Sequence, residues 1–150
     1  MARFSFVAFL GVAAVINIAL AITEDEKNNI RLNALPVLTS CAQELGIKME
    51  DVVAARQAKN LDALNPCYYA CFFKKINVID NDGLFVPAVA KANHQKYVHG
   101  ADDLARLSAS ADTCTSVNDQ AVTDGANGCD RAKLLARCFI DNHGVGPFSA

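Results

Sequence analysis

The succession of apolar and polar positions along the chain predicts helices joined by short loops, with few signs of strands. Apolar residues recur at intervals of three and four, as at Leu104, Leu107 and Ala111, and this spacing places them on one helical face. The pattern predicts six helices, at about 24–45, 49–59, 66–79, 87–98, 102–114 and 129–142. We therefore expect an all-α chain.

Residues at the predicted helix ends support these boundaries. Thr23 suits the N-cap of the first helix, with Glu26 three residues later as its capping-box partner. Asn65 followed by Pro66 is typical of a helix start, because Asn caps well and Pro is preorganised for the first turn. Pro36 lies inside the first helix and is expected to kink it or to split it in two.

The segment 80–83, Asp-Asn-Asp-Gly, could begin a calcium-binding loop or form a simple turn. A calcium loop of the EF-hand type needs Gly at its sixth position and Glu at its twelfth. Counted from Asp80, those positions hold Phe85 and Lys91. We therefore interpret the segment as a turn between the third and fourth helices.

The first 21 residues have the composition of a secretory signal peptide. Arg3 provides a positive charge, residues 4–20 are almost wholly apolar, and Ala19 and Ala21 form the small-x-small pattern of a cleavage site. A membrane anchor is the alternative, but acidic residues rather than a basic cluster follow the apolar run. We expect residues 1–21 to be removed and residues 22–150 to form a single secreted helical domain without a membrane span.

Charge adds one exclusion to this picture. The whole chain has a formal net charge of -2, its charges are interleaved, and no basic patch is present. Nucleic acid is therefore not an expected partner.

Six cysteines lie within residues 22–150, and an even number in a secreted chain is typical of three disulfides. Cys67 and Cys71 are four apart on one helical face, and such a pair seldom closes on itself. Cys129 and Cys138 are nine apart and point to opposite sides of a continuous helix. These two exclusions remove some of the possible pairings and leave the others open. The remaining cysteines are Cys41 and Cys114.

The cysteine spacing, C-x25-C-x3-C-x42-C-x14-C-x8-C, resembles the six-cysteine signature of the insect odorant-binding proteins, the pheromone-binding and general odorant-binding family. The x3 and x8 intervals match the most fixed features of that family, and the resemblance covers all of residues 22–150. It implies six helices around an internal hydrophobic cavity. It also implies the disulfides Cys41–Cys71, Cys67–Cys129 and Cys114–Cys138.

The cavity implied by this resemblance would be lined by apolar side chains that face inward, although each of these could equally be a plain core residue. Phe139 is the first choice because it follows the sixth cysteine directly, a position that often meets ligand in the resembling family. Phe148 is the second, because an aromatic residue on a short tail needs a place to dock. The predicted ligand-binding residues are Tyr69, Phe73, Ile76, Leu84, Phe85, Val89, Leu107, Ala111, Phe139 and Phe148.

Polar side chains give weaker signals. Tyr68 and Tyr69 point about 100° apart on a helix, so only one of them is expected to face inward. A hydroxyl of either, or of Tyr97, could hydrogen-bond a ligand. The histidines form no metal-binding arrangement: His94 and His99 are expected on the solvated surface. The resembling family can release ligand on acidification, and protonation of His143 could contribute to that release.

The predicted function is a secreted carrier of small hydrophobic ligands such as odorants or pheromones. It would work in sensillum lymph or a similar fluid, as a monomer or homodimer and without a cofactor. A sensory-neuron receptor is a further partner that the family suggests. The alternative is a secreted gland or haemolymph scaffold or carrier without an odorant role. An enzyme is not expected, because the chain lacks the Cys-Cys-x-x-His helix of secreted phospholipases and the Gly-x-Ser-x-Gly motif.

Overall fold

A computed structural model describes residues 22–142 and 147–148. Within these ranges it contains six α-helices, which confirms the predicted fold class; an isolated bridge between Ile79 and Phe85 is the nearest feature to a strand. The helices are α1 (Glu24–Glu44), α2 (Met49–Gln57), α3 (Pro66–Lys75), α4 (Pro87–Gln95), α5 (Ala101–Thr113) and α6 (Cys129–Asp141). Short 3-10 turns span Leu61–Ala63, Cys114–Asp119 and Gly125–Asn127.

Two predictions lie outside the described residues. The signal peptide at 1–21 falls there, and so does His143. In the described part of the chain, no helix combines the length and the apolar character that crossing a bilayer requires.

The predicted caps form at the starts of α1 and α3. The Thr23 hydroxyl accepts a hydrogen bond from the Glu26 N–H at 3.2 Å, and the Glu26 carboxylate accepts one from the Thr23 N–H at 2.9 Å. The Asn65 side chain accepts a hydrogen bond from the Cys67 N–H at 2.9 Å, with Pro66 in the first turn. Local chemistry therefore sets where these two helices begin.

α1 continues through Pro36, so the alternative in which this proline splits the helix is wrong. Because Pro36 has no N–H, the Leu32 carbonyl loses its usual helical partner. Both residues are exposed, so water can bond that carbonyl. On the opposite face Ala34 and Leu38 are buried against the core. This packing anchors the helix on both sides of the proline.

α3 is shorter than predicted and ends at Lys75 rather than near residue 79. Asn77 has a left-handed backbone with φ of 59°, which turns the chain out of the helix. The following 80–83 segment is a turn, as predicted: the Asp80 carboxylate accepts hydrogen bonds from the N–H groups of Asp82 and Leu84 at 3.0 and 2.9 Å.

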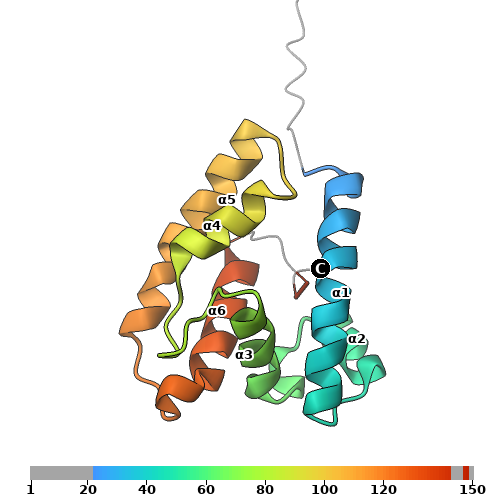
Figure 1. The fold of residues 1–150 in the computed structure, drawn as a ribbon, viewed down its shortest axis with the longest axis vertical. Coiled ribbons are helices and arrows are strands. Elements are labelled where there is room, and N and C mark those ends of the chain that lie inside the picture. Colours follow the sequence, from blue (N-terminus) through green and yellow to red (C-terminus); the bar gives the residue numbers. More distant parts are fainter. Residues whose placement is uncertain (1–21, 143–146, 149–150) are drawn as a thin grey trace, which may run out of the picture.

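Three disulfides tie four of the helices together, in the pairing that the family resemblance implied. Cys41–Cys71 joins α1 to α3, Cys67–Cys129 joins α3 to α6, and Cys114–Cys138 joins the end of α5 to α6. Their Cα–Cα distances are 5.8, 4.3 and 5.8 Å. In Figure 1, α3 and α6 lie between α1 on one side and the α4–α5 pair on the other.

The main hydrophobic core surrounds α3. Tyr68 and Tyr69 are both fully buried, so the prediction that only one of them faces inward is wrong. The Tyr68 hydroxyl donates to the Leu38 carbonyl of α1 at 3.3 Å, and the Tyr69 hydroxyl donates to the Leu61 carbonyl at 3.0 Å. Although the two side chains point in different directions, both meet other parts of the protein, because α3 is central and has neighbours on several sides.

Candidate functional site

A cavity of about 650 Å³, partly open to solvent, lies among α1, α3, α4, α6 and the residue pair 147–148. α1 contributes Ile30, Asn33 and Ala34 from its first half. The end of α3 and the segment after it contribute a second wall, α4 contributes a third, and α6 a fourth. Its aromatic lining is formed by Phe72, Phe73, Tyr97, Phe139 and Phe148.

Half of the predicted ligand-binding residues line this cavity. They are Phe73, Ile76, Val89, Phe139 and Phe148. They come from α3 and its C-terminal extension, from α4, from α6 and from the tail, so the fold brings together positions that are up to 75 residues apart in sequence. Their contact with a ligand is taken up below as a proposal.

The other predicted residues lie elsewhere in the structure. Tyr69 and Ala111 are buried in the main core, and Leu107 packs in a separate small cluster with Ile22 and Val98. Phe85 is buried behind Phe139, with ring centroids 5.7 Å apart, and Leu84 is exposed. Four of these five side chains are packed in the protein interior. A pattern of apolar residues cannot distinguish such a core position from a cavity-lining one.

Phe148 docks its ring onto the α3 aromatics. Its centroid lies 5.1 Å from those of both Tyr69 and Phe72 and 5.7 Å from that of Phe73, in edge-to-face arrangements. The tail therefore supplies one wall of the cavity through an aromatic side chain, which is the kind of docking that the sequence predicted for this residue.

The α4 contribution was mostly missed by sequence analysis. Beyond Val89, Asn93 and the C-cap residue Lys96 follow at spacings of four and three, and both line the cavity. Tyr97, which the sequence had offered as a hydrogen-bonding residue, lines the cavity just after the helix. That spacing relative to Val89 was a usable signal. The polar character of Asn93 and Lys96 obscured it.

His94 is also part of the lining, and the prediction that it is solvated is wrong. Its ring lies 6.4 Å from the Phe139 ring, and its Nδ1 atom is buried with no hydrogen-bond partner among the described residues. Burial lowers the pKa of the His94 imidazole below its usual value, so the ring is neutral at pH 7. His99 is exposed, as predicted.

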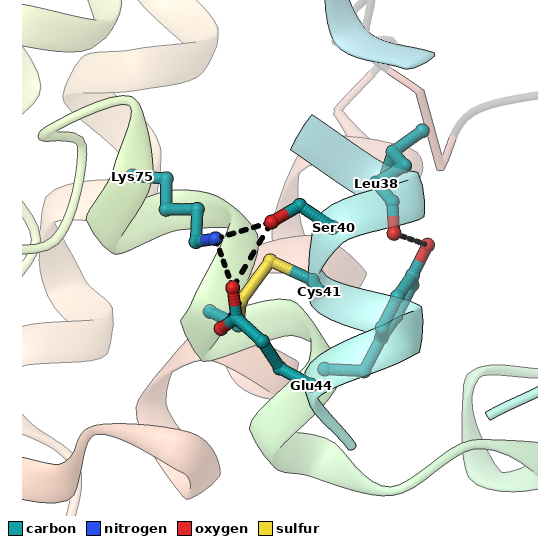
Figure 2. The surroundings of a disulfide bond; sticks show 7 residues. Leu38, Ser40, Cys41, Glu44 and Lys75 are labelled. Atoms are coloured by element: carbon teal, nitrogen blue, oxygen red, sulfur yellow. Dashed lines mark hydrogen bonds and ion pairs between the residues drawn. A yellow bond between two sulfur atoms is a disulfide. The ribbon is translucent and has the colours of Figure 1, made fainter. Parts of the chain in front are cut away.

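Lys75, another lining residue, places its ammonium next to Ser40 and Glu44, near the first disulfide (Figure 2). Its ammonium lies 2.5 Å from the Glu44 carboxylate and 2.7 Å from the Ser40 hydroxyl, beside Cys41–Cys71. The hydrogen bond from Lys75 is the main cause that lowers the pKa of the Glu44 carboxyl. The charge of this lysine is therefore compensated on the protein itself.

The site offers apolar contact area and a few hydrogen-bonding groups. Within residues 22–142 and 147–148, no group of three His, Cys, Asp or Glu side chains is arranged to hold a metal ion. Mostly apolar concave sites with a few convergent polar groups are typical of pockets for small molecules.

Comparison with known proteins gives one match. Residues 23–142 match the model of the PBP/GOBP family, which covers α1 to α6. Neither the curated proteins nor the solved structures give a match.

Proposed function

The chain belongs to the PBP/GOBP family, the insect odorant- and pheromone-binding proteins, and from this premise we propose that it carries small hydrophobic molecules in the cavity described above. Proteins of this family are secreted binding proteins rather than enzymes, and three disulfides fit an extracellular protein. Odorants or pheromones in sensillum lymph are the proposed cargo and setting. Removal of residues 1–21 and recognition by a sensory-neuron receptor belong to the same proposal.

The observation that carries the proposal is the cavity itself. A volume of about 650 Å³ lies within the range of known ligand pockets. Phe73, Phe139 and Phe148 present ring surface to it, and burial of apolar ligand area contributes about 25 cal/mol per Å² before ordering costs. Disulfides cross-link three of the helices around it, α1, α3 and α6, and this supports those walls when the cavity is empty.

Saturable binding of N-phenyl-1-naphthylamine, a fluorescent apolar probe, tests the proposal directly. A Val89→Phe variant adds volume at the cavity wall and is expected to weaken probe binding by about tenfold. Val53→Phe is the matched control, because Val53 is exposed on α2 and does not line the cavity. Absence of saturable, competable binding by the wild type would overturn the proposal and favour a scaffold role.

A further inference from the structure

The charged side chains at the cavity are all of one sign. Among the described residues of the lining, Lys75 and Lys96 are the charged ones, and neither Asp nor Glu occurs. The remaining polar groups are three asparagines, one tyrosine and the neutral His94. An apolar pocket whose only charges are cationic favours an anionic group on its ligand over a cationic one.

The two lysines differ in what surrounds their ammonium groups. Lys75 forms the ion pair with Glu44 and the hydrogen bond with Ser40 that Figure 2 shows. Lys96 instead donates a hydrogen bond to the amide oxygen of Asn93 at 2.8 Å, which is a neutral acceptor. No acidic side chain among the described residues pairs with Lys96. Its charge is therefore the one available to a ligand.

Asn93 fixes the position of that charge. The Asn93 amide N–H donates to the Ile76 carbonyl at 3.2 Å, so its oxygen is left to face Lys96. Asn93 is half-buried in the lining, whereas Lys96 is exposed. The ammonium is thus held where the cavity meets solvent, with two of its three N–H donors free of protein partners in the described part of the chain.

We propose that the preferred ligands of this cavity are single-chain carboxylates, with the acyl chain against Phe73 and Phe139 and the carboxylate at Lys96. Carboxylic acids are ionised at pH 7, and an N–H donor paired with a carboxylate gives a charge-assisted hydrogen bond. The inference rests on the proposed carrier function and specifies its ligand class. Because the pair lies at an exposed mouth, its contribution to affinity is about three- to fivefold.

A matched ligand pair tests the assignment. Dodecanoic acid and dodecan-1-ol share a chain and differ in the head group, and each displaces bound N-phenyl-1-naphthylamine from the wild type at neutral pH and low salt. Replacing Lys96 by Gln is expected to weaken binding of the acid by about three- to fivefold relative to binding of the alcohol. Lys96→Arg keeps the charge and is expected to keep the wild-type ratio. Lys48→Gln, at an exposed lysine before α2, controls for net charge.

The outcomes separate this inference from the function beneath it. An acid-to-alcohol affinity ratio in Lys96→Gln equal to that of the wild type, or an equal change in Lys48→Gln, would overturn the carboxylate assignment and leave the carrier function standing. If neither ligand nor probe binds the wild type, the carrier function itself fails. Added salt is expected to weaken binding of the acid relative to that of the alcohol in the wild type. In Lys96→Gln it is expected to leave the acid-to-alcohol affinity ratio unchanged.

Discussion

The carboxylate of Glu26 accepts a hydrogen bond from the backbone N–H of His99 at 2.8 Å, across 73 positions of sequence. The contact joins the first turn of α1 to the connection between α4 and α5. Beneath it, Ile22, Val98 and Leu107 form a small buried cluster. None of the three disulfides spans this end of the molecule, so non-covalent contacts hold the α4 wall of the cavity toward α1 there.

Replacing Glu26 by Ala removes this contact together with the capping box of α1. We expect a lower melting temperature, because the His99 N–H and the Thr23 N–H both lose their acceptor. Glu50→Ala is the control, since Glu50 is also an exposed acidic residue in the first turn of a helix but has no such bond. Thermal unfolding followed by circular dichroism measures both; equal melting temperatures for the two variants would contradict the expectation.

Acidification is expected to loosen the same contact. Hydrogen bonds from the Thr23 backbone, the His99 backbone and the Thr23 hydroxyl, in that order, hold the pKa of Glu26 below its usual value of 4.5. The unfolded chain therefore takes up the proton first. The stability contributed by Glu26 is present in full above about pH 4.5 and is lost as the pH falls through the lower folded-state pKa.

The difference between wild type and Glu26→Gln isolates this carboxyl from the others that titrate in the same range. Melting temperatures measured from pH 6 down to pH 3 should converge for the two proteins as the pH falls. A gap that stays constant over this range would show that ionisation of Glu26 has no part in the contact.

Removing the disulfide that closes the longest loop should cost the most stability. Cys67–Cys129 spans 62 residues and Cys114–Cys138 spans 24. The chain-entropy relation then assigns about 4 kcal/mol to the first and about 3.5 kcal/mol to the second. Urea unfolding of the two paired Cys→Ala variants measures both free energies; a larger loss for the shorter loop would be evidence against this ordering.

Phe148→Ala should weaken both stability and ligand binding. The ring is half-buried against Tyr69 and Phe72, and its removal is expected to lower the free energy of unfolding by about 1–2 kcal/mol. Phe148→Leu keeps most of the bulk without the aromatic edges. Its free energy of unfolding and probe affinity should lie between those of the wild type and Phe148→Ala. Unchanged stability and unchanged probe affinity in Phe148→Ala would mean that the tail does not dock in solution.

Much of the fold could be predicted because the signals are local. The spacing of apolar residues located all six helices, and Thr23 with Glu26 located the start of α1 to the residue. The disulfide pairing did not follow from helix geometry alone; it came from the resemblance of the cysteine spacing to a family. The helix ends were less accurate, as at Asn77, whose left-handed backbone follows from no pattern of apolar positions.

By itself the sequence determined which faces of the helices are apolar, since that depends only on residues three and four apart. Whether an apolar face meets protein or empty space was decided by the tertiary structure. Leu107 and Val89 were equivalent in the sequence, yet one packs against Ile22 and the other lines the cavity. His94 is half-buried for the same reason: the Phe139 ring beside it comes from α6, some 45 positions away along the chain.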